Sequence, residues 1–120
     1  MILFLSIMII INNVEELDEF ILNNSSKVVL LYFGASWCGP CKKLKQKLNE
    51  KETQDSMPQL AVCYIDIELP DVQDLVMQYE VASLPTQIFI KLDDIKVKII
   101  DRLTGYDFIK LKLIYDKLMQ

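Results

Sequence analysis

The sequence feature that most constrains the fold is a continuous apolar run early in the chain. Lys27 to Phe33 reads KVVLLYF and contains no charged residue after its lysine. A strand with one face in water alternates apolar and polar residues, whereas an uninterrupted run is typical of a strand covered on both faces. Strands of that kind lie in the middle of α/β folds, with helices on both sides of the sheet. The run therefore predicts a central strand of an α/β protein.

Strand-like and helix-like segments alternate around this run. Ser6 to Ile11 predicts a strand because it is rich in isoleucine and uninterrupted. The apolar spacing from Val14 to Leu22 predicts a helix, which Asn12 or Asn13 can cap. We also expect a helix from Cys41 to about Lys51 and a strand at Leu60–Ile67.

The second half of the chain predicts a hairpin between two helices. A short helix should run from Pro70 to Tyr79, with its proline in the first turn. Strands at Thr86–Leu92 and Ile95–Leu103, joined by a turn at Asp93-Asp94, should pair in antiparallel fashion. A last helix is expected at about Asp107–Met119. The resulting order, βαβαβαββα, predicts a central mixed sheet flanked by helices, built by residues 1–120 as one domain.

The N-terminal segment MILFLSIMIII is apolar over about eleven residues, whereas a transmembrane helix needs about twenty. It has neither the basic start nor the small-residue cleavage site of a secretory signal. We interpret residues 1–7 as a short apolar extension before the first strand, with a targeting segment as the alternative and Met8 as a possible start. The formal net charge of −4 argues against nucleic acid as the main partner, and we expect no membrane association.

The cysteines point to redox chemistry rather than to a metal or a disulfide scaffold. The chain has only Cys38, Cys41 and Cys63, too few for a secreted disulfide framework, and it has no histidine. Cys38 and Cys41 form a C-x-x-C, but no second pair completes a zinc site, so no metal is predicted. The pair is either a redox centre or two ordinary buried thiols. Its place between a strand and a helix favours the redox interpretation.

The two cysteines should have different roles. Thiol–disulfide exchange needs a thiolate, and the free N–H groups of a helix N-terminus stabilise an anion placed there. Cys38 at such a terminus should be the attacking thiolate and the more exposed sulfur. Cys41, three residues later, should be the buried resolving thiol, with its N–H directed toward Cys38. Pro40 suits the first helical turn because it lacks an N–H.

Three further features leave alternatives open. Pro85, in Ser83-Leu84-Pro85-Thr86, either ends a loop or forms a rare cis peptide bond. Cys63 lies in a predicted strand and is either an inert buried thiol or a regulatory one. The helix after Cys41 has five lysines and one acid between residues 41 and 51. This face is either simply solvated, a docking site for an acidic partner such as a reductase, or support for the thiolate.

The residues Trp37-Cys38-Gly39-Pro40-Cys41-Lys42, followed by Tyr79–Ile90 (YEVASLPTQIFI) and Gly105, resemble the thioredoxin family from about Met8 onward. The resemblance implies the thioredoxin fold and reduction of protein disulfides without a bound cofactor, in a reducing compartment such as the cytoplasm. It implies disulfide-containing protein substrates, a reductase or other thiol donor, and a monomer. Cys38 and Cys41 would be catalytic, and the substrate-binding residues would be Trp37, Gly39, Pro40, Leu84, Pro85 (cis) and Gly105.

Two alternative functions are a disulfide oxidant or isomerase and a non-catalytic interaction module. The Gly39-Pro40 pair resembles the reducing members of the family, and the presence of both cysteines argues against the module. One departure concerns the resolving step. The family usually has a buried aspartate where this chain has Tyr32, and a phenol of ordinary pKa about 10 is a poor base at neutral pH. We therefore expect slow resolution and a long-lived mixed disulfide.

Overall fold

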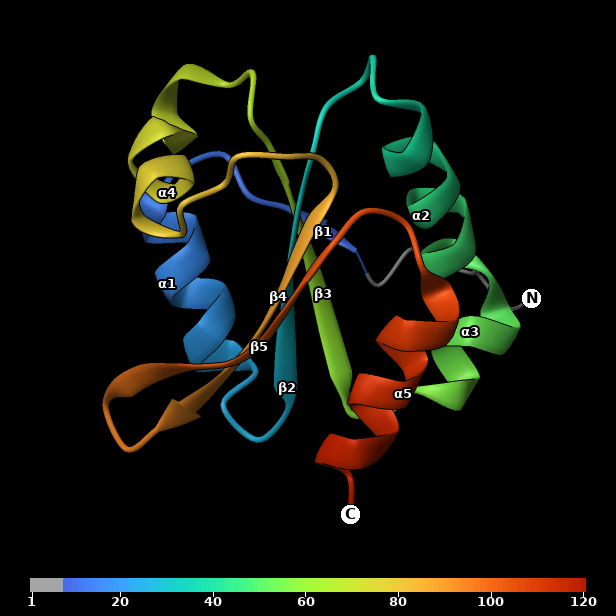
Figure 1. Ribbon diagram of the computed structural model, residues 1–120. Helices are drawn as coiled ribbons and strands as arrows, with labels where there is room; N and C mark the ends of the chain where they lie inside the picture. The colour runs from blue at the N-terminus through green and yellow to red at the C-terminus, as the bar shows by residue number, and fades with distance from the viewer. Residues whose placement is uncertain (1–7) are drawn as a thin grey trace, which may run out of the picture.

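The computed structural model describes residues 8–120 and contains a five-stranded sheet covered by helices on both faces (Figure 1). The strand order is β1-β3-β2-β4-β5. The elements in chain order are β1 (Ile9–Ile10), α1 (Val14–Asn23), β2 (Val28–Gly34), α2 (Gly39–Asn49), α3 (Lys51–Ser56), β3 (Leu60–Asp66), the 3-10 turn η1 (Pro70–Val72), α4 (Gln73–Gln78), β4 (Thr86–Asp93), β5 (Lys96–Thr104) and α5 (Phe108–Leu118). The flanked mixed sheet agrees with the residue patterns, and its topology is the thioredoxin fold that the family resemblance implied.

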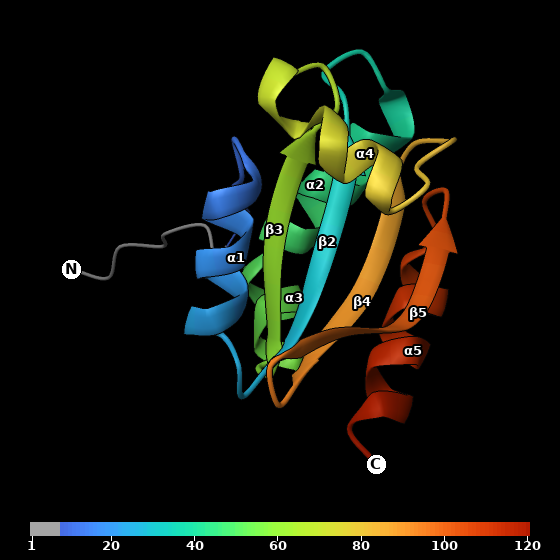
Figure 2. The ribbon, with the colours of Figure 1, turned by 90° about the vertical axis from the view of Figure 1, so that its left-hand side faces the viewer.

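The predicted central strand is β2, and all seven of its residues are buried. It pairs in parallel with β3, from Val28 opposite Leu60 to Gly34 opposite Asp66. On its other side it pairs in antiparallel fashion with β4. Figure 2 shows β2 between these two neighbours, with the twist that is usual for a mixed sheet.

Alternate residues of β2 contribute to two separate apolar cores. Leu30 and Tyr32 face the side covered by α2 and α5, where they pack with residues such as Leu44. Leu31 and Phe33 face the side covered by α1 and α4. Figure 1 shows α1 and α4 on one side of the sheet, and α2, α3 and α5 on the other. This three-layer arrangement explains why a continuous apolar run was needed at β2.

The helix boundaries follow local capping chemistry. The side chain of Asn13 accepts a hydrogen bond from the backbone N–H of Glu16 at 2.9 Å, which caps α1 as expected. The Asp107 side chain caps α5 in the same way, by accepting from Lys110 N at 3.0 Å.

Three predicted elements differ from the structure by more than one residue. We expected one helix to about Lys51, but α2 ends at Asn49, and the extended backbone of Glu50 (φ −69°, ψ 136°) separates it from α3. The apolar spacing of α2 did not reveal α3, because only Thr53 is buried there. The predicted helix after residue 70 begins as the turn η1. Among the described residues of the predicted first strand, Ile9 and Ile10 form β1, and the N–H of Ile11 donates to the Tyr64 carbonyl at 2.9 Å; residues 1–7 lie outside the described part of the chain.

Candidate active site

The C-x-x-C lies where β2 ends and α2 begins, at the carboxyl end of the central strand. Cys38 is the N-cap of α2, and its sulfur accepts a hydrogen bond from the backbone N–H of Cys41 at 3.2 Å. The two cysteines form a disulfide across a Cα–Cα distance of 5.2 Å. Pro40 lies in the first turn, where its missing N–H leaves no backbone donor unpaired. The N–H of Cys41 and the dipole of α2 would stabilise a thiolate at Cys38 after reduction.

The residues around the disulfide differ strongly in exposure. Cys38 is 6% exposed and Cys41 is 2% exposed, so Cys38 is the more accessible residue of the pair. The neighbouring Trp37 is 66% exposed, which leaves a large apolar surface for contact with another protein. Of the two sulfur-bearing residues, Cys38 is therefore the one that lies nearer the surface next to this exposed ring.

A groove of about 490 Å³ runs beside the disulfide. It brings together five residues that the sequence singled out, namely Trp37, Cys38, Gly39, Pro40 and Leu84. Its remaining walls are Ile67, Val81, Ala82 and Ser83, which the sequence analysis did not identify as site residues. Ile67 directly follows β3, so the rule that sites gather at the carboxyl ends of parallel strands points to it.

Pro85, which directly follows Leu84 of this groove, lies next to Gly105. The Leu84–Pro85 peptide bond is cis, as the family resemblance implied and contrary to the simple loop-ending alternative. The backbone N–H of Gly105 donates to the carbonyl of Pro85 at 2.8 Å. Gly105 has φ +82°, a left-handed conformation that favours glycine. All eight residues predicted for the site therefore lie at one end of the sheet.

Gly34 is a further residue of the site that the sequence analysis did not single out. A Cβ added to it would lie 3.0 Å from Cε1 of Tyr64, 3.1 Å from Cε1 of Tyr32 and 3.4 Å from Cβ of Cys41. The absence of a side chain thus lets two aromatic rings and the first turn of α2 meet at the end of β2. A glycine directly after the apolar run was the available signal.

Two tyrosines form the wall behind Cys41. The Tyr32 hydroxyl donates a hydrogen bond to the backbone carbonyl of Cys41, and the ring centroids of Tyr32 and Tyr64 are 4.9 Å apart. Burial raises the pKa of Tyr32, and the adjacent Tyr64 raises it further. Burial, followed by the charges of Asp66 and Glu68, raises the pKa of Tyr64 to about 12. Both phenols are therefore neutral at pH 7, and neither supplies a base for Cys41.

The lysines of α2 are held in different ways. Lys45 lies over the Tyr64 ring, with its Nζ 5.4 Å from the ring centroid. Lys47 lies over the Phe108 ring at 5.0 Å and pairs with Glu50 at 3.2 Å. Packing on rings and a surface ion pair therefore account for part of this basic face.

Cys63 lies in β3 and is completely buried on the face opposite the disulfide. Burial raises the pKa of its thiol, so the thiolate needed for exchange is strongly disfavoured. These facts support the inert interpretation of Cys63.

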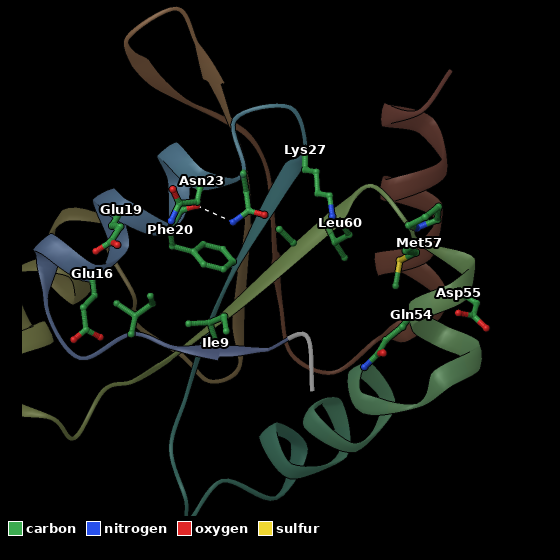
Figure 3. A pocket seen from close by; sticks show the side chains of 14 residues that line it. Ile9, Glu16, Glu19, Phe20, Asn23, Lys27, Gln54, Asp55, Met57 and Leu60 are labelled. Atoms are coloured by element: carbon green, nitrogen blue, oxygen red, sulfur yellow. Dashed lines mark hydrogen bonds between the residues drawn. The ribbon is translucent and has the colours of Figure 1, made fainter. Parts of the chain in front are cut away.

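A second, larger hollow of about 740 Å³ lies between α1, α3 and the β1 edge of the sheet (Figure 3). Its lining includes Ile9, Phe20, Lys27 and Met57, and no residue of the C-x-x-C turn or the Pro85 loop takes part. Within residues 8–120, no cluster of three or more side chains suited to a metal ion is found. No helix in this part of the chain has the length and apolarity needed to cross a bilayer.

Comparison with known proteins supports the resemblance seen in the motif. Residues 8–111 match the thioredoxin family model. The chain is 33% identical to thioredoxin-T of Drosophila melanogaster over 81 residues, which cover 68% of this chain and 50% of that protein. It is 38% identical to mouse mitochondrial thioredoxin over 77 residues, which cover 64% of this chain and 45% of that protein. The matches thus span about half the length of these two relatives.

A solved structure covers nearly the whole chain. The thioredoxin of Trichomonas vaginalis superposes with a TM-score of 0.82 at 25% identity, covering 95% of this chain and 99% of that one.

Proposed function

Because the chain belongs to the thioredoxin family, we propose that it is a thiol–disulfide oxidoreductase that reduces disulfide bonds in other proteins. The observation that carries this proposal is the position of Cys38, whose sulfur caps α2 and borders an apolar groove. A protein disulfide that docks against the groove meets the one sulfur of the pair that backbone donors can hold as a thiolate.

The proposed cycle starts from the reduced pair. The Cys38 thiolate attacks one sulfur of the substrate disulfide, and the other substrate sulfur leaves as a thiolate and takes a proton. Cys41 then loses its proton and attacks Cys38 in the mixed disulfide. This step forms the Cys38–Cys41 bond seen in the structure and releases the second substrate thiol. A dithiol donor, such as a reductase, returns two electrons and two protons to the pair, and Cys38 then releases one of these protons to solvent to become the thiolate.

Substrate contact is proposed for six residues: Trp37, Gly39, Pro40, Leu84, Pro85 and Gly105. An extended substrate segment can pair with the backbone next to Pro85, while its apolar side chains cover Trp37. Gly39 supports such contact, because no atom outside its chain neighbours and its own helix backbone lies within 4 Å of the place where its Cβ would be, so the substrate backbone can approach closely.

Reduction of insulin disulfides tests the activity. We expect turnover with wild-type protein, none with Cys38→Ser, and a trapped mixed disulfide with Cys41→Ser that mass spectrometry detects. A reduction potential near about −270 mV would support the reductase, and one near about −180 mV would support an oxidant or isomerase instead. Turnover that survives Cys38→Ser would disprove the assigned roles.

The remaining expectations extend this proposal. We propose that the chain works as a monomeric single domain without a cofactor, in a reducing compartment such as the cytoplasm. Mitochondrial thioredoxins among its relatives make the mitochondrion the compartment to compare, by microscopy of the tagged native protein. Sedimentation of the oxidised protein would test the monomer.

A further inference from the structure

The side chain of Gln87 is a buried polar group that the proposed cycle does not use. Gln87 lies in β4, two residues after Pro85, and it is 0% exposed. Its Nε2 donates to the carbonyl of Gly105 at 3.1 Å. Its Oε1 is buried and has no hydrogen-bond partner among residues 8–120. A buried acceptor without a hydrogen-bond partner lowers the stability of the folded protein, and such groups are rare in native structures.

Gln87 lies on the same face of the sheet as Tyr32. It is directly opposite Tyr32 in the antiparallel β2–β4 ladder, and directly opposite Leu103 in the β4–β5 ladder. Opposite residues in such ladders point to the same face, with Cβ atoms about 4.5–5.5 Å apart. Tyr32, Leu103 and Cys41 all pack in the core between the sheet and the helices α2 and α5. The orphan oxygen therefore lies on the face of the sheet that Cys41 covers.

The oxidation state of the cysteine pair determines whether Cys41 has a proton to donate in a hydrogen bond. In the disulfide, the Cys41 sulfur carries no proton and donates no hydrogen bond. Reduction breaks the S–S bond, adds two electrons and two protons from a dithiol donor, and leaves an S–H on Cys41. Cys41 is 2% exposed, so water is largely absent as an acceptor for this proton. The acceptors around the Cys41 thiol are then the Cys38 sulfur, the Tyr32 oxygen and the Gln87 oxygen, and of these the Gln87 oxygen is the one without a hydrogen-bond partner in the oxidised protein.

We propose that Gln87 is a positioning residue for the reduced pair, with its Oε1 accepting a hydrogen bond from the Cys41 thiol. This inference rests on the proposed redox function and adds a determinant of its reduction potential. The acceptor is unpaired in the disulfide and paired in the dithiol, so Gln87 favours the reduced form. The bond from Nε2 to Gly105 is independent of the oxidation state and cancels from the redox equilibrium.

The test is the redox equilibrium of Gln87→Met, which keeps the length of the side chain and removes both polar atoms. The equilibrium constant for reduction by dithiothreitol should fall about tenfold, which corresponds to about 30 mV toward a more negative potential. Ile90→Val is the matched control, since it weakens the core on the opposite face of the sheet and should leave the constant unchanged. A change below twofold in Gln87→Met would overturn the proposal.

A second measurement keeps Gln87 unchanged, so it does not depend on whether a Gln87 variant folds. The ¹³C chemical shift of the Gln87 side-chain carbonyl should differ between reduced and oxidised wild-type protein. The ¹³C shift of the backbone carbonyl of the buried Thr53 should be the same in both. In a Cys63→Ala background, the S–H stretching band of Cys41 should lie at a hydrogen-bonded frequency. An unmoved carbonyl shift with a free S–H band would also overturn the proposal. Insulin turnover by the same samples tells this failure apart from failure of the redox function.

Discussion

Replacing Tyr32 by phenylalanine separates two roles that its hydroxyl can have at Cys41. The hydroxyl holds the first turn of α2 by donating to the Cys41 carbonyl, and it is the polar side-chain atom that reaches this residue from β2. If it is only a structural donor, its removal should lower stability and leave the resolving step unchanged. If it also takes part in proton transfer, the rate at which the mixed disulfide resolves should fall.

The stability change follows from the geometry. Tyr32 is 1% exposed, so the lost bond is not replaced by bulk water. The Cys41 carbonyl lies inside α2, where the helix ladder uses one of its two lone pairs. The loss should therefore be near the middle of the usual range, about 1 kcal/mol. For a chain of this size that is a fall of about 4 °C in Tm.

The rate should follow the ionisation of Cys41 alone. A free thiol has a pKa of about 8.5, so about 3% is thiolate at pH 7, and that fraction rises about tenfold per pH unit below the pKa. Because burial and Tyr64 raise the pKa of Tyr32, no phenolate is present in this range to accept the proton. The resolution rate should thus rise about tenfold between pH 6 and pH 7, in wild type and in Tyr32→Phe alike.

Rapid mixing of the reduced protein with a disulfide substrate, followed through Trp37 fluorescence, measures this step. Tyr32→Asp provides the opposite arm, because a carboxylate is a competent base and general-base catalysis typically contributes 10²-fold or more. We expect at least about tenfold faster resolution at pH 6 in that variant, with a flatter pH profile. A tenfold slowing in Tyr32→Phe, or no acceleration in Tyr32→Asp, would refute the reasoning.

Four further outcomes can be checked. Gly34→Ala should destabilise the protein by about 1–3 kcal/mol in urea unfolding, since the added Cβ meets two rings at 3.0–3.1 Å. Gly105→Ala should cost only about 1–2 kcal/mol, because its φ is +82° but no atom outside its chain neighbours lies within 4 Å of the new Cβ. Cys63 should resist maleimide in the native protein, react fully in urea, and give the same non-reducing gel when replaced by serine. The free energy of unfolding should fall above about pH 10, by up to about 1.4 kcal/mol per pH unit for Tyr32, because the Tyr32 phenol ionises at lower pH in the unfolded chain than in the folded protein. Ionisation of Tyr64 adds to this fall, and Tyr32→Phe should make the pH dependence of stability shallower.

The residue patterns predicted correctly those elements that are buried on one face or on both faces. The apolar run of β2 and the spacing in α1 correctly predicted a doubly covered strand and an amphipathic helix. They were insufficient for α3, where only Thr53 is buried and the segment has no apolar face to reveal it. The end of α2 at Asn49 depends on the extended backbone of Glu50, and no glycine or proline marks that position.

The candidate site shows a similar division. Cys38, Cys41 and Pro40 could be interpreted from local chemistry, because a helix N-terminus acts on neighbours in the sequence. The cis bond at Pro85 could not be predicted from the residues alone, and only the family resemblance implied it. The pairing of Gln87 with Tyr32 depends on strand register, so the composition of the wall became visible only in three dimensions.

The first attack by Cys38 and the resolving step at Cys41 depend on different parts of the structure. The environment of Cys38 is built mainly from backbone, since the N–H of Cys41 and the dipole of α2 act on its sulfur whatever side chains surround them. The environment of Cys41 includes the side chains of Tyr32 and Tyr64, neither of which is a base at neutral pH, and the proposed contact with Gln87 adds no base. Substitution in this wall can therefore change the rate of resolution and the reduction potential while leaving the first attack intact. A chain with this wall should form mixed disulfides readily and release them slowly, which favours substrates that stay bound in the groove until Cys41 ionises.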